Sequence, residues 1–192
     1  PSERGVFELI YEALPKEREF VLRTYPLIGL PLAFLLVGAR GEAPEESRAL
    51  LSLLLFTPGV YLPLLLAHVP VSASHRARWI LDGAPLSKPQ IDAAAIKAVA
   101  VRFLVPLYVA LGGLAWLLCG AGFALRLTPV AYLATLLVVR QLYVGFNIEK
   151  PLSLPPEAVS GDQSWFNAMA VIALLLTVVA VFAVKLLASP WV

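Results

Sequence analysis

Five long, continuous apolar stretches dominate this sequence of 192 residues. The hydrocarbon core of a bilayer is about 30 Å thick, and a helix of about 20 apolar residues can cross it. Continuous apolar runs favour helices over barrel strands, in which apolar and polar residues alternate. The sequence therefore predicts an all-α, polytopic membrane helix bundle, with spans at about 21–38, 49–71, 97–119, 127–146 and 166–188.

The composition excludes several classes of soluble protein. Apolar residues make up 59% of the chain and charged residues 15%, whereas soluble domains average about 45–50% and about 25%. A soluble globule of this size could not bury so much apolar surface, and a net charge of +2 gives no basic field for nucleic acid. We therefore expect an integral membrane protein and no nucleic-acid partner. A cytosolic enzyme domain and a disordered tail are both excluded.

The chain begins Pro1-Ser2-Glu3-Arg4, which does not resemble a signal peptide because a basic start and a short apolar run are missing. We treat residues 1–192 as a single transmembrane domain that can belong to a longer protein. Residues 1–20 precede the first span. Within them, apolar residues share one face of an amphipathic helix over 3–14: Val6, Phe7, Ile10, Tyr11 and Leu14. This helix either lies at the cytoplasmic membrane interface or is the end of a further domain.

The distribution of lysine and arginine between the connections predicts the orientation of the chain. Nine of them lie on the side of the N-terminus and four on the opposite side, so the N-terminus is expected in the cytoplasm. The first group is Arg4, Lys16, Arg18, Arg23, Arg76, Arg78, Lys88, Lys97 and Lys150, and the second is Arg40, Arg48, Arg126 and Lys185.

The connection between the second and third spans carries the clearest local signals. Residues Arg76 to Leu81 favour a short helix that ends at Gly83. Ser87 and Gln90 have the spacing of a capping box, which predicts a helix start at Lys88. The apolar run that follows predicts that this helix continues to about Cys119, well beyond the length of one span.

This connection resembles the cytoplasmic connection of the ABC-2 type exporter permeases over residues 79–97. Pro85-Leu86-Ser87 and Lys97 match the positions of a Pro-Leu/Val-Ser step and of a lysine before the third span. The family's Gly-Thr-Leu-Glu element is absent, and so is its sixth span. The resemblance implies that a separate ATPase subunit packs against this region. The residues expected to dock it are Arg76, Arg78, Trp79, Leu81, Pro85 and Ser87. An ordinary interfacial loop is the alternative.

Polar residues inside the predicted spans mark a second candidate site. Charge within a membrane is costly, so each intramembrane arginine is a functional candidate. Arg102 lies near the start of the third span, and Arg140 lies deep in the fourth beside Gln141 and Tyr143. These four residues either bind an anionic substrate group or lipid phosphate, or the arginines extend to the cytoplasmic headgroups. No span contains a carboxylate, which disfavours a proton relay.

The sequence predicts no metal or cofactor site. Cys119 is the only cysteine, and His68 and His75 have no cysteine or carboxylate between them. No Walker lysine motif is present, so ATP chemistry would reside on another chain. No catalytic motif is present either, and whether the chain is an enzyme stays open.

The leading interpretation is a permease-like transmembrane subunit of an ATP-driven transporter in the bacterial plasma (inner) membrane. The alternative is a non-catalytic structural or assembly subunit of a membrane complex. A membrane-embedded enzyme that acts on a lipid-linked substrate is the third interpretation, and the missing acid–base pair disfavours it. The expected partners are membrane lipids, a cytoplasmic ATPase subunit, and further transmembrane subunits or a second copy of the chain.

Overall fold

The computed structural model describes residues 2–38, 44–83, 85–145, 148–155 and 163–188. These residues are mostly helical, and their only β-type pairing is an isolated bridge between Val71 and Leu154. The predicted all-α class is therefore confirmed. The elements are α1 (Ser2–Ala13), η1 (Leu14–Lys16), α2 (Arg18–Gly38), α3 (Pro44–Ala67), η2 (His75–Arg78), α4 (Trp79–Asp82), α5 (Lys88–Val99), η3 (Ala100–Leu104), α6 (Val105–Cys119), α7 (Ala121–Gly145) and α8 (Gln163–Ala188).

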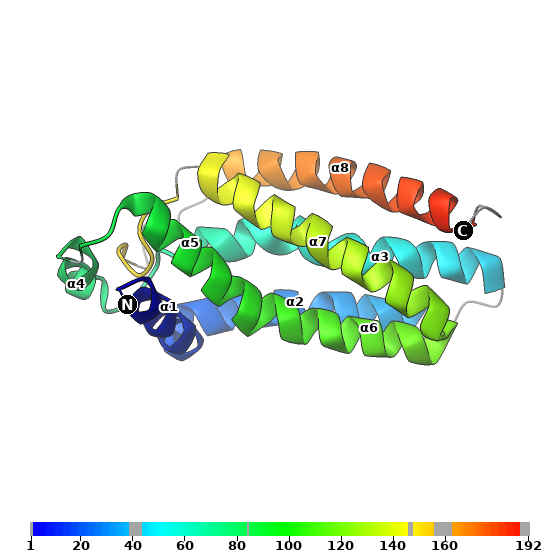
Figure 1. Ribbon diagram of the computed structural model, residues 1–192, viewed down its shortest axis with the longest axis horizontal. Helices are drawn as coiled ribbons and strands as arrows, with labels where there is room; N and C mark the ends of the chain where they lie inside the picture. Colours follow the sequence, from blue (N-terminus) through cyan, green and yellow to red (C-terminus); the bar gives the residue numbers. More distant parts are fainter. Residues whose placement is uncertain (1, 39–43, 84, 146–147, 156–162, 189–192) are drawn as a thin grey trace.

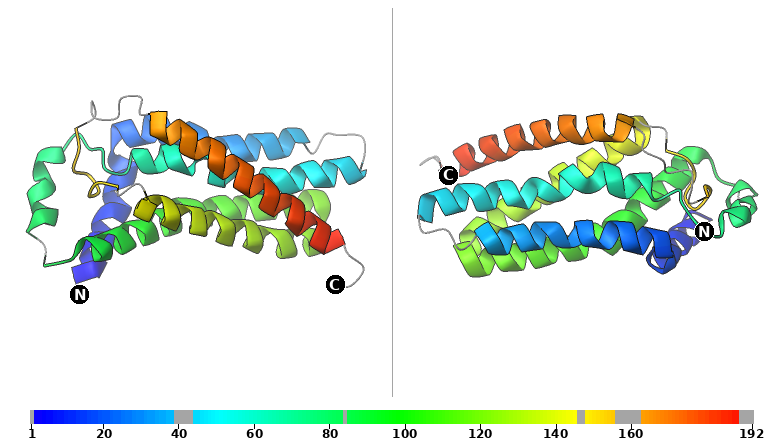
Figure 2. Two further views of the ribbon diagram at one scale, coloured as in Figure 1. Left: turned by 90° about the horizontal axis from the view of Figure 1, so that it is seen from above. Right: turned by 180° about the vertical axis from the view of Figure 1, so that it is seen from behind.

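The long helices α2, α3, α6, α7 and α8 run side by side along the long axis of the molecule (Figures 1 and 2). Helix α3 packs against α8, α7 and α2, and α6 packs against α7. The short helices α1 and α4 lie at one end, which also carries the N-terminus (Figure 1). We call this the α4 end. The bundle thus has one end built from short helices and connections, and an opposite end at which α6 turns into α7.

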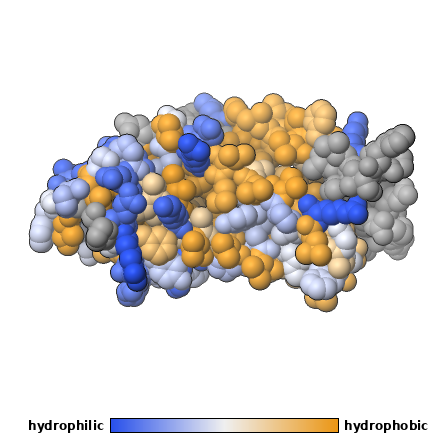
Figure 3. Space-filling model, in the orientation of Figure 1, coloured by the Kyte–Doolittle hydropathy of each residue, from blue (hydrophilic) through white to orange (hydrophobic). Residues whose placement is uncertain are grey.

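Among the residues that the structure describes, two helices are long and apolar enough to cross a membrane, judged by length and composition. One is the 32-residue helix Lys88–Cys119, which comprises α5, η3 and α6, and the other is α7, with 25 residues. Shorter apolar helical segments occupy Phe20–Ala33, Leu51–Ala67 and Met169–Phe182. A bundle that crosses the membrane five times stays a prediction. Hydrophobic residues cover the middle of the face in Figure 3, and hydrophilic residues gather toward the α4 end.

The helix predicted to run from Lys88 to about Cys119 is confirmed, and it contains a π-helical turn at η3. Val105 N–H donates to the carbonyl of Ala100, five residues earlier. Pro106 follows immediately and has no N–H to offer to the carbonyl of Arg102. A π-turn is a common way for a helix to accommodate such a local break without ending.

A buried polar contact joins the three central helices. The hydroxyl of Tyr108 on α6 lies 3.2 Å from the carbonyl oxygen of Leu55 on α3 and 3.3 Å from that of Ala131 on α7. It also pairs with the hydroxyl of Thr135. Because all of these groups are buried, the contact fixes the axial positions of the three helices relative to one another.

Two helix boundaries differ from the predicted spans. Helix α3 ends at Ala67 rather than near 71, because residues 68–71 turn toward the bridge at Leu154. Helix α7 begins at Ala121 rather than near 127, so Gly120 alone separates it from α6. Gly120 has φ 89° and ψ 163°, a conformation that is essentially restricted to glycine. One glycine is therefore enough to reverse the chain between the two helices.

Gly120→Ala is expected to lower the free energy of unfolding by about 1–3 kcal/mol, because alanine is strained in that conformation. An added Cβ would meet nothing within 4 Å, so the loss comes from the backbone alone. Gly122→Ala is the matched control, since its Cβ would also meet nothing within 4 Å and its φ is not positive. Reversible unfolding in detergent measures both variants. Equal stability of the two variants would contradict the proposed strain.

Candidate functional site

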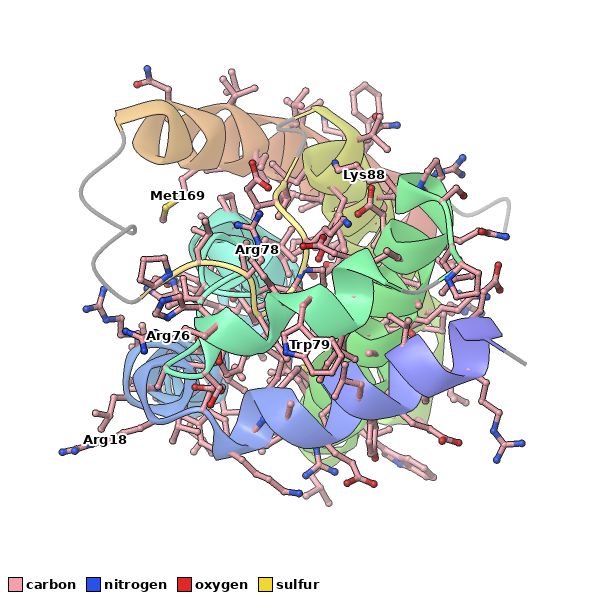
Figure 4. All side chains as sticks on the ribbon, turned by 90° about the vertical axis from the view of Figure 1, so that its left-hand side faces the viewer. Arg18, Arg76, Arg78, Trp79, Lys88 and Met169 are labelled. Atoms are coloured by element: carbon pink, nitrogen blue, oxygen red, sulfur yellow. The ribbon has the colours of Figure 1, made fainter. Side chains whose placement is uncertain are left out.

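The α4 end presents a large aromatic side chain to the surroundings. Trp79 is 69% exposed and Ile80 is 48% exposed, whereas Leu81 is buried in the core. Figure 4 looks onto this end and shows Trp79 on the outward side of α4, beside α1. Leu81 therefore attaches α4 to the bundle, and Trp79 and Ile80 form its outer surface.

The remaining residues of the predicted docking set lie on both sides of α4. Arg76 and Arg78 are exposed on η2, and Pro85 and Ser87 are exposed between α4 and α5. Gly83 N–H donates to the carbonyl of Trp79 at 2.8 Å, which confirms the predicted end of the short helix. The structure thus brings five of the six predicted docking residues to the surface of one end of the molecule.

The start of α5 has the predicted capping contact. The backbone N–H of Ser87 donates to Oε1 of Gln90 at 3.0 Å, and the hydroxyl of Ser87 lies 3.0 Å from the same oxygen. This contact gives the first turn of α5 a fixed starting point.

An ion pair connects α4 to the segment after α7. Asp82 Oδ1 accepts a hydrogen bond from Lys150 Nζ at 2.7 Å, and Asp82 Oδ2 lies 3.4 Å from Arg78 Nε. The hydrogen bond from Lys150 lowers the pKa of the Asp82 carboxyl below its ordinary value of 3.8. Asp82 and Lys150 lie 68 residues apart in the sequence, so no local sequence pattern predicts this pair.

Three connections meet beneath α4. The carboxylate of Glu17 accepts hydrogen bonds from the Ser72 hydroxyl at 2.6 Å and from the Ala73 N–H at 3.2 Å. Ser72 N–H donates to the carbonyl of Leu154 at 3.0 Å, and Leu154 N–H donates to that of Pro70 at 2.8 Å. The segments before α2, after α3 and after α7 are therefore joined, and α4 rests on a hydrogen-bonded junction.

A second feature is a groove of about 1070 Å³ between the helix α5–η3 and α7. Arg140 and Tyr143 line it, together with Lys88, Asp92 and Lys97, which the sequence analysis had not assigned to this site. Lys88 and Asp92 lie four residues apart on α5 and form an ion pair at 3.7 Å. Their spacing of four residues is a sequence pattern that predicts two side chains on the same face of a helix.

The other two residues of the predicted intramembrane site lie elsewhere. Arg102 donates a hydrogen bond from Nη1 to the Tyr11 hydroxyl at 3.2 Å, and its guanidinium lies 4.8 Å from the centre of the Tyr11 ring. It therefore holds α1, whose apolar face packs against α5. Gln141 is exposed and is not among the residues that line the groove.

No group of His, Cys, Asp and Glu within the described ranges could hold a metal ion. His68 is buried at the end of α3, His75 is partly buried in η2, and Cys119 is partly buried before Gly120. These residues lie in three separate parts of the chain.

The chain matches no protein-family model, curated protein or solved structure. The α4 end and the groove are therefore the features on which a functional proposal can be based.

Acidification is expected to release α4 from residue 150. Because the pKa of Asp82 is lowered in the folded protein, the ion pair contributes stability above the ordinary pKa of 3.8 and loses it as pH falls through the lowered value. Spin labels at Ile80→Cys and Glu149→Cys, with Cys119→Ala, report the distance between the two segments. The distance distribution should be narrow at pH 7 and should broaden below about pH 3.8.

Lys150→Met should broaden the distribution already at pH 7, and acidification should then add little. Lys16→Met is the control, because Lys16 belongs to a separate exposed pair with Glu12 at 3.7 Å. Identical distributions in wild type and Lys150→Met would show that the ion pair does not hold α4.

Proposed function

We propose that this chain is a permease-like transmembrane subunit of an ATP-driven transporter, and that a separate cytoplasmic ATPase docks on the α4 end. The observation that supports this proposal most directly is the 69% exposure of Trp79, which forms the outer surface of α4 together with the 48% exposed Ile80. Tryptophan and arginine dominate the binding energy of protein interfaces, and Arg76 and Arg78 lie close to Trp79 in the sequence. The resemblance to ABC-2 type permeases over residues 79–97 adds to this proposal.

We further propose that the bundle crosses the membrane five times, with the α4 end in the cytoplasm. The five long apolar segments lie side by side, and large apolar side chains are exposed on them, including Leu117, Val109 and Leu174. Soluble proteins rarely expose so much apolar surface. The α4 end carries Arg76, Arg78 and Lys150, which agrees with the cytoplasmic excess of lysine and arginine.

The junction beneath α4 supplies a route from the docking surface into the bundle. Lys150 ties α4 to the segment after α7, and Glu17 ties the end of α3 to the start of α2. A partner that displaces α4 therefore acts on several long helices at once. This is what a transporter subunit requires, because ATP hydrolysis on another chain has to move its helices.

The alternative is a non-catalytic structural or assembly subunit, and one observation favours it. An apolar groove of about 400 Å³ between α6 and α7 is lined by Gly112, Gly113 and Trp116. Small residues allow close packing of membrane helices, so a further transmembrane subunit or a second copy fits this face. In that case Trp79 would lie among lipid headgroups and no ATPase would bind.

Trp79→Ala should weaken ATPase binding by about 2 kcal/mol or more, because it removes the aromatic anchor. Phe182→Ala is the matched control, since Phe182 is 64% exposed, lies in the last turns of α8 and lines neither groove. Both variants are purified in mild detergent, and the associated proteins and ATP hydrolysis are measured. If the wild-type complex contains no ATPase, the permease proposal fails, and equal retention by both variants would reject Trp79 as the anchor.

The proposed orientation is testable with single cysteines in a Cys119→Ala background. A membrane-impermeant thiol reagent should label Ser74→Cys only from the cytoplasmic side and Gly122→Cys only from the opposite side. Both positions are exposed, and an added Cβ at Gly122 meets nothing within 4 Å. Labelling of both positions from the same side would contradict the proposed topology.

A further inference from the structure

We propose that the groove between α5–η3 and α7 binds a lipid with a negatively charged phosphate headgroup. The headgroup lies among Lys88, Lys97 and Arg140, and the acyl chain lies along the apolar wall. This inference does not depend on an ATPase partner, because it concerns only residues of this chain.

The polar part of the groove has an excess of positive charge. Three cations line it, Lys88, Lys97 and Arg140, against the single carboxylate of Asp92. Asp92 forms its ion pair with Lys88 on the same helix. Two positive charges therefore remain, Lys97 on the α5 wall and Arg140 on the α7 wall, which match an anionic phosphate between them. A guanidinium can form two parallel hydrogen bonds to phosphate oxygens.

A buried hydroxyl at the groove has no partner. Tyr143 lines the groove and is 1% exposed, and its hydroxyl forms no hydrogen bond within the part of the chain that the structure describes. Oδ1 of Asp92, which lines the same groove, is likewise buried without a partner. Leaving such buried groups without a hydrogen-bond partner is destabilising. Headgroup oxygens supply acceptors for Tyr143, and a headgroup hydroxyl supplies a donor for Asp92.

The rest of the groove is apolar and suits an acyl chain. Its wall includes Ile96, Val101, Leu133, Leu137 and Val144. Leu133 and Leu137 are exposed on α7, so the groove is open to the bilayer along this helix. The volume of about 1070 Å³ exceeds what a phosphate alone would fill.

The polar and apolar parts of the groove follow one another along the helices in the same order as the headgroup and acyl chain of a membrane lipid. Lys88 and Asp92 lie in the first turns of α5, and Arg140 and Tyr143 lie in the last turns of α7, both toward the α4 end (Figure 1). The apolar residues Val101 and Leu133 lie nearer the middle of these helices. The site therefore takes the headgroup near the cytoplasmic surface and the acyl chain toward the bilayer centre.

The test uses the full chain, stripped of lipid in mild detergent. Native mass spectrometry and thermal unfolding measure the binding of dioleoyl phosphatidate, of dioleoyl phosphatidylcholine and of inorganic phosphate. Phosphatidate should bind at least about tenfold more tightly than phosphatidylcholine, because its headgroup has a net negative charge, whereas the choline ammonium neutralises the phosphate of phosphatidylcholine. Inorganic phosphate should bind far more weakly than phosphatidate, because it cannot occupy the apolar wall.

Arg140→Gln and Lys97→Gln should each weaken phosphatidate binding by about tenfold. Arg140→Lys should lie in between, because it keeps the charge and loses the paired hydrogen bonds. Arg126→Gln is the matched control, since Arg126 is an exposed arginine on the same helix that does not line the groove. Tyr143→Phe should weaken binding by a smaller factor and should not reduce stability in the lipid-free protein.

Three results would overturn the proposal. Equal binding of phosphatidate and phosphatidylcholine would show that the groove holds boundary lipid without selectivity for the headgroup. Phosphate binding as tight as phosphatidate binding would show an anion site without a lipid. An equal loss in Arg126→Gln and Arg140→Gln would show a general charge effect. This experiment does not depend on ATPase co-purification. Failure of the lipid proposal would therefore leave the docking proposal intact, and failure of the docking proposal would leave the lipid proposal intact.

Discussion

The backbone hydrogen bonds of the helix Lys88–Cys119 are the constraint on which the rest of the structure depends. In an apolar surrounding each N–H and C=O needs a partner within the helix, so this segment continues through Pro106 with a π-turn rather than breaking. Its continuity places several of the features described above on one helix. The first turns carry Lys88 and Asp92, the middle carries Arg102 and its contact with α1, and the last turn leads into α7 through Gly120.

The same helix connects the two proposed sites. Helix α4 is separated from α5 by the few residues between Gly83 and Ser87, and the capping contact of Ser87 with Gln90 fixes where α5 begins. Lys88 then lies both at the edge of the α4 end and in the wall of the groove. A partner on α4 and a lipid in the groove would therefore act on one helix start. In the proposed orientation, that arrangement would link events at the cytoplasmic surface to the proposed lipid site.

Local sequence signals predicted what depends on local physics. The all-α class, the long helix from Lys88, the helix end at Gly83 and the contact between Ser87 and Gln90 all follow from hydropathy and capping rules, and the structure has each of them. The sequence did not predict pairs that lie far apart along the chain. Arg102 is a candidate for lipid or substrate binding from its sequence position, and its contact with Tyr11, 91 residues away, is not predicted by any local pattern. The single-residue turn at Gly120 was missed because Gly-Ala-Gly resembles an ordinary loop, whereas only the observed φ shows that one residue suffices.

The π-turn at Ala100–Leu104 also allows a local rearrangement within the long helix. A π-turn holds one more residue than an α-helical turn, and that surplus residue can move along the helix by exchanging one hydrogen-bond partner at a time. Each residue that it passes rotates by about 100° and advances by about 1.5 Å. Residues between Lys97 and Tyr108 could in this way change the face of the helix on which they lie, while the helix on either side keeps its position and its hydrogen bonds.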